Sequence, residues 1–380
     1  MTNDYLARLS KGLILFDGAM GTALYEKGIF LNRCFEEINI SNPEIVLDIH
    51  LDNIRAGAQV ITTNSFGANP LKLAGYNMAG RTEEFNTAAV NIAAEAIKTS
   101  GADDVLIAGS VGPLGKLIKP LGKLSEDEAE QAFSRQIRAL AAAGADIILL
   151  ETFRNMHELL IAAAAARQAA PGLPVQAHFS IATAADECSG GIFPEDREEF
   201  INEAVERAVR LDESDLTDVI GTNCGVGPAD MLDILTAVRA RVKKPFVVMP
   251  NAGLPKDIDG RQIYLADADY FSEYALKFLD AGASAIGGCC GTTPLHIKKM
   301  GKAVLNLSSG RKAVAFKKAD KDVRVFDTVP LRERSTLGKA LAEKEWVTTI
   351  ELIPPMGTDL SGIIKKTGSL AVPGVTTVNL

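Results

Sequence analysis

Residues 143–151 read AGADIILLE: a glycine between two alanines, then an apolar run that ends in a carboxylate. The same phrase opens residues 56–62, AGAQVIT, and residues 281–287, AGASAIG. Glycine at the end of a helix adopts the left-handed conformation that closes it, and a short apolar run is typical of a buried strand. Each phrase therefore predicts a helix that passes directly into a strand of a parallel sheet.

Short apolar runs of this kind alternate with amphipathic or alanine-rich segments along most of the chain. There are eight of them: Leu13–Asp17, Val60–Thr63, Val105–Gly109, Ile147–Glu151, Val175–Ser180, Asp218–Thr222, Phe246–Met249 and Ala285–Gly288. Helices are expected between them, for example at Ser125–Ala143, Met156–Ala169 and Ala266–Ala281, the first opened by a capping box. Eight such units close into a barrel whose active site lies at the C-terminal ends of the strands.

We therefore predict an α/β protein with a (β/α)8 TIM barrel. An open, doubly wound sheet is the alternative architecture. No Gly-x-Gly-x-x-Gly turn follows the first predicted strand, which argues against a dinucleotide-binding fold.

The C-terminal part of the chain departs from this pattern. Residues 308–334 are basic and irregular, and a helix at Ser335–Glu343 and strands at Trp346–Leu352 and Val375–Leu380 follow. One helix and two strands cannot bury a core of their own. We therefore predict a barrel at residues 1–307, a linker at 308–334 and the incomplete start of a second α/β domain at 335–380.

Composition excludes several classes of function. The 380 residues carry a net charge of -8, and no run of Lys and Arg forms a basic stripe, so neither nucleic acid nor an anionic membrane is an expected partner. No apolar stretch reaches the ~18 residues that a membrane span needs, and the N-terminus does not resemble a signal peptide. Five cysteines are too few for a disulfide framework. We expect a cytoplasmic protein that acts on a small molecule.

Three of the five cysteines follow predicted strands within glycine-rich turns: Cys224 after the sixth, and Cys289 and Cys290 after the eighth. These strands are near neighbours in a barrel, so the three sulfurs should converge on its catalytic rim. Three protein ligands with one open position describe a catalytic zinc site, whereas structural zinc takes four. The alternatives are packed, apolar cysteines and a redox disulfide, which adjacent cysteines form only with strain. No two of the four histidines are paired at ligand spacing.

Five motifs carry a family resemblance, in the order DGAMGT at 17–22, TTNSF at 62–66, LET at 150–152, GTNC at 221–224 and GGCCGT at 287–292. Over Leu13–Leu305 the chain resembles the homocysteine S-methyltransferases. The resemblance implies a (β/α)8 barrel, a zinc ion held by Cys224, Cys289 and Cys290, and methyl transfer to the thiolate of homocysteine, giving methionine. The family includes betaine- and S-methylmethionine-dependent enzymes and the homocysteine module of cobalamin-dependent methionine synthase.

The resemblance also places other residues in the substrate pocket. A free thiol has a pKa of ~8.5 and is mostly protonated at neutral pH, so zinc is expected to remove its proton before an in-line attack on the methyl carbon. Glu151 is the first candidate to bind the substrate ammonium, with Asp17 as its helper. Thr63, Asn64 or the backbone N–H groups after Asp17 are candidates for the substrate carboxylate. Asn223 completes the predicted pocket and is expected to orient the zinc loop.

The methyl donor is left open. Methylcobalamin, methyltetrahydrofolate and S-methylmethionine are all candidates. No cobalamin-binding segment is visible, so a corrinoid would have to come from another domain or protein.

The tail has its own resemblance. WVTTIELIPP at 346–355 is similar to the opening strand of methylenetetrahydrofolate reductase, which implies the N-terminal part of a bifunctional protein. Glu351 would be the acid of that reductase and FAD its cofactor, but only in a complete domain. We expect no reductase activity from these residues alone.

Two functions of other classes compete with methyl transfer. An aldolase-type lyase would need an essential lysine or a carboxylate-bound metal at a strand end, and no such lysine is found. A zinc-stabilised, non-catalytic scaffold would unfold when its metal is removed, whereas a catalytic barrel would stay folded.

Overall fold

The computed structural model describes residues 4–29, 33–181, 197–254, 256–258, 261–308, 330–351 and 377–379. The chain divides into two compact units, Met1–Ala313 and Val314–Leu380. None of the helices in the described ranges combines the length and apolar character needed to cross a bilayer.

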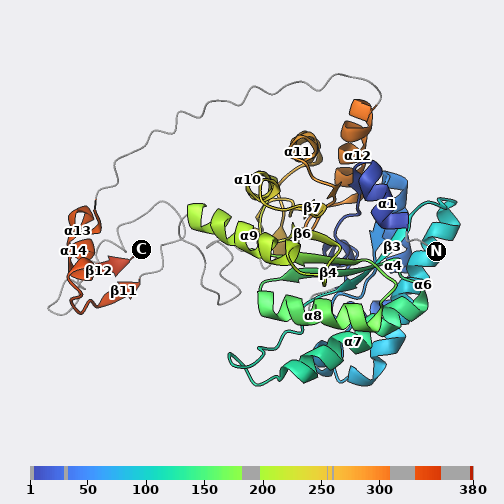
Figure 1. Cartoon of the computed structure of the whole chain (residues 1–380), viewed down its shortest axis with the longest axis horizontal. Helices are drawn as coiled ribbons and strands as arrows, with labels where there is room; N and C mark the ends of the chain where they lie inside the picture. The colour runs from blue at the N-terminus through green and yellow to red at the C-terminus, as the bar shows by residue number, and fades with distance from the viewer. Residues whose placement is uncertain are drawn as a thin grey trace. The chain divides into compact units, whose positions relative to one another are not determined.

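The first unit is built around eight parallel strands. They are β1 (Ile14–Leu15), β2 (Val60–Thr62), β3 (Leu106–Val111), β4 (Ile147–Phe153), β5 (Val175–Phe179), β6 (Val219–Asn223), β7 (Phe246–Met249) and β10 (Ala285–Ile286), paired in the order β1-β10-β7-β6-β5-β4-β3-β2. The Phe16–Val60 bridge and the hydrogen bond from Gln59 N to Leu15 O (2.8 Å) join β1 to β2 and close the sheet. The predicted (β/α)8 TIM barrel is confirmed (Figure 1).

Helices connect the strands and surround them (Figure 1). In chain order they are α1 (Asp4–Lys11), α2 (Met20–Glu26), α3 (Ile38–Ser41), α4 (Pro43–Ala56), α5 (Pro70–Ala74), η1 (Ala79–Arg81), α6 (Thr82–Ser100), α7 (Glu126–Ala143), α8 (Met156–Ala169), α9 (Arg197–Asp212), α10 (Pro228–Arg239), α11 (Ala268–Asp280) and α12 (Pro294–Ser308). The predicted capping box at Ser125 and Glu128 opens α7. The repeated glycines have positive φ, 105° at Gly57, 105° at Gly144 and 88° at Gly282, as the helix-to-strand phrase requires.

Successive side chains of each strand point to opposite faces of the sheet, so the buried side chains form two apolar cores. Along β5, Val175, Ala177 and Phe179 belong to the large apolar cluster packed against the helices. A second cluster contains apolar residues of β1, β2, β3, β4, β6, β7 and β10, among them Phe16 and Leu149, and fills the barrel. Because successive side chains of a strand point to opposite faces, every second residue of each strand faces the interior.

Helix α1 contributes to the end of the barrel interior opposite the catalytic rim. Its Tyr5 is fully buried in the interior cluster. The Tyr5 hydroxyl donates to Gln176 Oε1, and Gln176 Nε2 donates to His178 Nε2 (3.0 Å). His178 is therefore a buried, hydrogen-bonded barrel residue.

The strands differ in extent from the predicted runs. β3 and β4 continue two residues further than predicted, to Val111 and Phe153, and β4 has a register shift between Leu150 and Phe153. The connection after β7 contains an antiparallel hairpin, β8 (Lys256–Ile258) and β9 (Arg261–Ile263), which was not predicted. The register shift could not be predicted from the pattern of apolar residues, because the polar residues between Leu150 and Phe153 are also typical of the start of a loop.

The second unit contains α13 (Leu331–Arg334), α14 (Thr336–Ala342), β11 (Thr349–Glu351) and β12 (Thr377–Asn379), and the two strands pair in parallel. Ser335 caps α14 by accepting a hydrogen bond from Gly338 N (3.0 Å). Most of the linker expected at 308–334 and the Pro354-Pro355 pair lie outside the described residues. Glu351 ends β11, and its side chain is also outside the described part of the chain.

Candidate active site

The three cysteines after β6 and β10 come together at the C-terminal rim of the barrel. The Sγ atoms of Cys224, Cys289 and Cys290 all lie within 4.8 Å of one another, and Cys224 and Cys290 are 3.9 Å apart. In a tetrahedral zinc site with Zn–S bonds of about 2.3 Å, two sulfurs are separated by about 3.8 Å. The three thiols therefore fit around one ion with little movement.

Backbone contacts from the segment after β7 hold both cysteine turns. Cys224 N donates to Met249 O (3.1 Å), Cys289 N donates to Pro250 O (2.8 Å), and Ala252 N donates to Cys290 O (2.8 Å). Since β7 lies between β6 and β10 in the sheet, this segment links the two turns and fixes their separation.

The turn at Cys224 requires an unusual backbone. Cys224 has a φ of 60° and Gly225 a φ of 76°. A Cβ atom on Gly225 would lie 2.1 Å from Ile181 O, so only glycine fits. The left-handed backbone conformation of Cys224 carries a steric cost, and it turns the thiol toward Cys290.

The DGAMGT motif at 17–22 is bonded to the cysteine loop. Gly288 N donates to Asp17 O (3.1 Å), Ala19 N to Thr292 Oγ1 (3.2 Å), and Gly291 N to Thr22 Oγ1 (3.2 Å). Gly18 N donates to Asn53 Oδ1 (3.1 Å). The N–H groups of Gly18 and Ala19, which were candidates for the substrate carboxylate, are thus already used within the protein.

Ionisation of one thiol in the cysteine cluster opposes ionisation of the other two. Interaction with Cys289, and then with Cys290, holds the pKa of Cys224 well below its usual range. The Cys224 thiolate in turn raises the pKa of Cys290 to about 12, and that of Cys289 well above its usual value. A second ionisation is opposed by the first, so the protein alone keeps two protons that a bound dication would displace.

Asn223 connects this cluster to the part-buried carboxylate of Glu151. Asn223 Nδ2 lies 3.2 Å from Glu151 Oε2 and 3.7 Å from Cys289 Sγ, and Asn223 Oδ1 accepts from Thr152 N (2.8 Å). Ser110 Oγ donates to Glu151 Oε1. Burial raises the pKa of Glu151 to about 7, although the Ser110 hydrogen bond opposes this shift. Asn223 therefore touches both predicted parts of the site.

Asp17 is the second carboxylate of the rim. Its Oδ2 accepts from Thr62 N (2.7 Å) and its Oδ1 from Thr62 Oγ1 (2.9 Å). Burial raises the pKa of Asp17 to about 7 despite these bonds, and the charge of Glu151 raises it further. A cation bound beside the two carboxylates would restore their ionised form.

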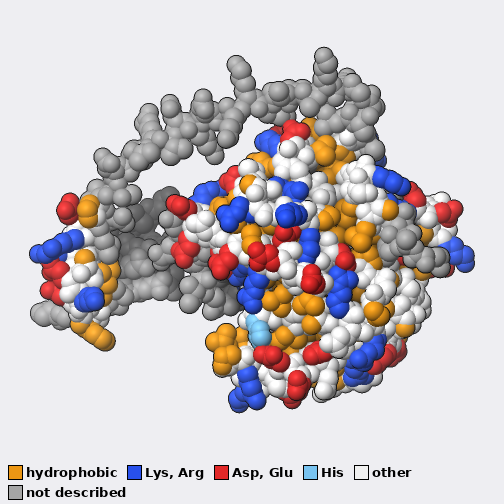
Figure 2. All heavy atoms as spheres, in the orientation of Figure 1, with side chains coloured by type: hydrophobic (Ala, Val, Ile, Leu, Met, Phe, Trp, Pro, Cys, Tyr) orange, Lys and Arg blue, Asp and Glu red, His pale blue; other side chains and the backbone are white. Residues whose placement is uncertain are grey.

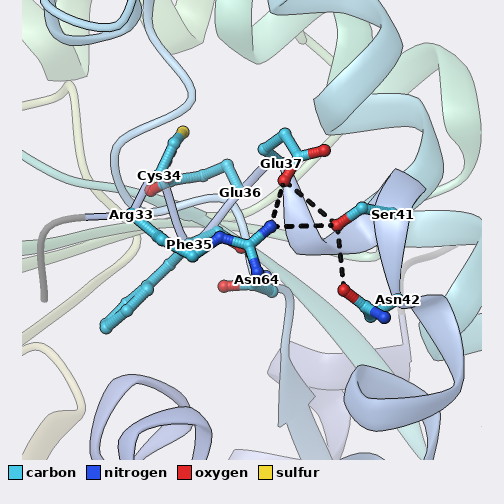
Figure 3. Close-up of polar contacts among 8 residues, drawn as sticks. All are labelled: Arg33, Cys34, Phe35, Glu36, Glu37, Ser41, Asn42 and Asn64. Atoms are coloured by element: carbon cyan, nitrogen blue, oxygen red, sulfur yellow. Dashed lines mark hydrogen bonds and ion pairs between the residues drawn. The ribbon is translucent and has the colours of Figure 1, made fainter. Parts of the chain in front are cut away.

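Thr63 and Asn64 use their side chains to brace the loop after β2. Thr63 Oγ1 lies 2.6 Å from Ser65 Oγ and accepts from Ser110 N (3.0 Å). Asn64 Nδ2 donates to Phe35 O (2.7 Å), beside the ion pair of Arg33 and Glu37 (3.0 Å) (Figure 3). These contacts support the rim from outside the cysteine cluster.

Three further residues of the rim were not predicted. Ser110 donates to Glu151, Asn251 N donates to Val226 O (3.0 Å) beside the Cys224 turn, and the Tyr264 ring lies against Gly291, next to Cys290. Asn251 Oδ1 is buried and has no partner among the described residues. Ser110 and Asn251 continue the interior-facing alternation of β3 and β7, and that signal was present in the sequence. Tyr264 follows the unpredicted hairpin and had no such signal.

Comparison with known proteins places this barrel among characterised families. The model of the family "Homocysteine S-methyltransferase" matches residues 14–304. The methionine synthases of Mycobacterium tuberculosis and Mycobacterium leprae are each 30% identical in alignments of 326 and 320 residues that cover 82% and 81% of this chain. These residues are 26% of each synthase, so the chain spans about a quarter of the length of these relatives.

Solved structures give the same result. The metallated form of the homocysteine methyltransferase MmuM from Escherichia coli superposes with a TM-score of 0.62 at 25% identity, over 77% of this chain and 97% of that one. The apo form of the same enzyme superposes with a TM-score of 0.56 at 26% identity, over 77% of this chain and 96% of that one. Because the family model covers the barrel from β1 into α12, including all three clustered cysteines, the chain belongs to the homocysteine S-methyltransferase family.

Proposed function

We propose that this barrel transfers a methyl group to the sulfur of L-homocysteine, giving methionine. One observation carries the proposal: three Sγ atoms within 4.8 Å of one another share a rim with the buried carboxylate of Asp17 and the part-buried carboxylate of Glu151. An amino acid with a free thiol needs two kinds of partner. Thiolates of the protein hold the metal that binds the substrate thiol, and carboxylates of the protein bind the substrate ammonium. Membership of the family supports the same reaction.

Zn²⁺ is the proposed cofactor, held by Cys224, Cys289 and Cys290. The donor set fits, because three soft thiolates select zinc over magnesium or calcium, and the measured separations match a single ion. When bound, zinc lowers the proton affinity of a thiol and keeps it as a nucleophilic thiolate at neutral pH. The glycines at 225 and 291 allow the cysteine side chains to face one another.

Glu151 is proposed to bind the substrate ammonium, and Asp17 to add negative charge beside it. The pKa of each is about 7 in the protein alone, so a neighbouring cation would favour their ionised forms. Asn223 would hold Glu151 at a set distance from Cys289, which couples amino-acid binding to the thiol position. For the substrate carboxylate, Thr63 and Asn64 stay candidates with weaker support, because both are bonded within the loop.

The methyl donor is proposed to be methylcobalamin, methyltetrahydrofolate or S-methylmethionine, approaching from the open end of the barrel in line with the sulfur. If the donor is methylcobalamin, a corrinoid protein or domain outside residues 1–380 would carry it. We also propose that residues 308–334 link the barrel to the start of a reductase-like domain at 335–380. Glu351 and FAD would act only in the complete domain. A cytoplasmic location stays a prediction.

The test is to incubate the purified, zinc-loaded protein with homocysteine and each donor separately and to measure methionine by mass spectrometry. Formation of methionine with one donor identifies it, and the Cys224→Ala variant should form none. Failure with every donor, including methylcobalamin, would reject the proposal. Turnover of another substrate without any methyl donor would instead favour a lyase.

A further inference from the structure

Strand β4 has one more residue than its neighbour β5 at the rim of the barrel. Leu150 and Phe153 pair with residues of β5 that are only two positions apart, so two residues, Glu151 and Thr152, lie where a regular strand has one. Leu150 and Phe153 both belong to the large apolar cluster packed against the helices. Because side chains alternate along a strand, one interior-facing residue would normally separate two such positions. The bulge therefore adds a second residue to the part of β4 that faces the rim.

The backbone of the bulge is strained at Thr152. This residue has a φ of 65°, in the left-handed region. Its side chain is branched at Cβ, and branched residues are rare in this region because the branch crowds the backbone. The other non-glycine residues with positive φ in the described ranges are Asn77, Cys224 and Lys344, and none of them is β-branched. Such a conformation persists only where surrounding contacts hold it.

Asn223, at the end of β6, supplies these contacts. Its side chain is fully buried. Asn223 Oδ1 accepts from Thr152 N (2.8 Å), and Asn223 Nδ2 donates to Thr152 Oγ1 (2.8 Å). Since β5 lies between β4 and β6 in the sheet, the amide reaches across the end of β5. One side chain thus holds both the backbone N–H and the hydroxyl group of the strained residue.

The N–H group of Thr152 also decides which way the Asn223 amide faces. A backbone N–H can only donate, so it must face Oδ1 and not Nδ2. In this orientation Nδ2 lies 3.2 Å from Glu151 Oε2 and 3.7 Å from Cys289 Sγ. In the reversed orientation Oδ1 would lie beside the Glu151 carboxylate, and two acceptors would oppose each other. Thr152 therefore fixes the donor that contacts Glu151.

We propose that Thr152 is a positioning residue for the substrate ammonium. Its left-handed backbone directs its N–H and hydroxyl groups to Asn223, and this keeps Asn223 Nδ2 on the Glu151 carboxylate. The role rests on the proposed function, because it assumes that Glu151 binds the ammonium of homocysteine. It makes the strained bulge of β4 a determinant of specificity, which favours thiols that carry an amino group over thiols that do not.

The test compares homocysteine with 4-mercaptobutanoic acid, which differs from it only in lacking the amino group. Calorimetry on the zinc-loaded protein gives the dissociation constant of each thiol, and their ratio measures the preference for the amino group. Thr152→Val removes the hydroxyl group and keeps the shape of the side chain. Zinc content and the affinity for 4-mercaptobutanoic acid should stay at wild-type values. Homocysteine should bind about three- to tenfold more weakly, as expected for the loss of one hydrogen bond between neutral groups.

Three further variants make the test specific. Thr152→Ala also removes the hydroxyl group and fits a left-handed backbone with less crowding, so it gives the same readout if the valine variant does not fold. Thr152→Ser keeps the hydroxyl group and should keep the wild-type preference. Thr236→Val, on the surface of α10, removes a hydroxyl group that donates to Leu232 O (2.8 Å) and should change neither constant.

Three results would overturn the role of Thr152. The first is an equal weakening of both thiols in Thr152→Val and Thr152→Ala, which would show that the residue only supports the fold. The second is wild-type constants in both variants. The third is the same loss in Thr152→Ser as in Thr152→Val, which would show that the hydroxyl group does not act.

Failure of the proposed function gives a different pattern. If the wild-type protein binds the two thiols equally, or if Glu151→Gln keeps the preference for homocysteine, Glu151 does not bind the ammonium, and the role of Thr152 is rejected with it. If Glu151→Gln abolishes the preference while Thr152→Val and Thr152→Ala keep it, only the role of Thr152 is rejected.

Discussion

The two ends of the barrel interior follow one alternation but contain different chemistry. The floor, where α1 meets the N-terminal ends of the strands, is lined by apolar residues, and Tyr5 there bonds to Gln176, which bonds to His178 further along β5. The rim, at the C-terminal ends, contains Asp17, Glu151 and the three cysteines. Glu151 and the three cysteines are partly exposed, whereas Tyr5, Gln176 and His178 are fully buried.

Burial changes the pKa of groups at both ends, with different consequences. Inside the barrel, burial lowers the pKa of His178 to about 3, and the neutral ring suits an apolar interior. At the rim, burial raises the pKa values of Asp17 and Glu151 to about 7, so their charge is disfavoured without a cation. The neutral form of His178 is favoured without a ligand, whereas the ionised forms of Asp17 and Glu151 would be favoured by a cation bound at the rim. Changes at the rim should therefore affect binding, and changes at the floor should affect stability.

Figure 2 shows that charged and apolar side chains mix on one outer face of the molecule, so charge is not confined to the rim.

The largest expected effect is the loss of a cysteine ligand at the rim. Cys224→Ala, Cys289→Ala and Cys290→Ala should each lose the single zinc ion and reduce methyl transfer by more than about a hundredfold, beyond the loss typical of residues that only support a metal ligand. Elemental analysis and methionine formation are the measurements. Cys34→Ala, which removes a buried thiol outside the cluster, is the matched control and should keep the metal. Retained stoichiometric zinc in all three rim variants contradicts the assignment.

Removal of the Glu151 charge should weaken substrate binding next most strongly. Glu151→Gln and Glu151→Ala should raise the dissociation constant of homocysteine by about ten- to a hundredfold, because a charge-assisted hydrogen bond contributes about 1.5–3 kcal/mol. Zinc affinity should change less. Calorimetry of metal and homocysteine binding separates the two, with Glu158→Gln, a buried carboxylate that accepts from Leu114 N, as the control. A larger effect on zinc than on homocysteine would place Glu151 in the metal site instead.

The rim should also make the stability of the ligand-free, metal-free protein depend on pH. Asp17 has a pKa near 7 when folded and an ordinary value near 4 when unfolded. The folded state thus binds more protons between these values, and stability falls as the pH rises from about 4 to about 7. Asp17→Asn should flatten this dependence by up to about 1.4 kcal/mol per pH unit.

Urea unfolding at a series of pH values measures the slope. The exposed Asp103→Asn should leave the slope as in the wild type. An unchanged slope in Asp17→Asn would show that this carboxylate is ionised before a ligand binds.

The smallest effect is expected at the floor. Tyr5→Phe leaves the Gln176 carbonyl without its donor and should lower the free energy of unfolding by about 1 kcal/mol. Urea unfolding measures this change, and Tyr270→Phe on the surface of α11 serves as the control. Zinc content and homocysteine affinity should stay at wild-type values. A change in zinc content or in homocysteine affinity would show that the floor and the rim are coupled and that the floor does not affect stability alone.

The rim residues show how far sequence reasoning extends. Cys224, Cys289 and Cys290 could be placed together because each follows a strand, and the C-terminal ends of parallel strands meet at one rim. Ser110 was missed because β3 was expected to end at Gly109, and the observed strand continues to Val111. Thr63 and Asn64 were candidates for the substrate carboxylate, and their side chains form hydrogen bonds with Ser110 and Phe35 that brace the rim. Their role as substrate ligands stays a prediction.

By itself the sequence determined the (β/α)8 order, the helix caps and the cysteines at strand ends, because these depend on local backbone preferences and on the period of apolar residues. Only the tertiary structure decided that Asn223 joins Glu151 to Cys289, that Thr62 holds Asp17, and that Tyr264 packs against Gly291. Each of these contacts joins separate elements of the barrel. Their geometry depends on how the strands are staggered around the closed sheet, and that stagger is a property of all eight strands together.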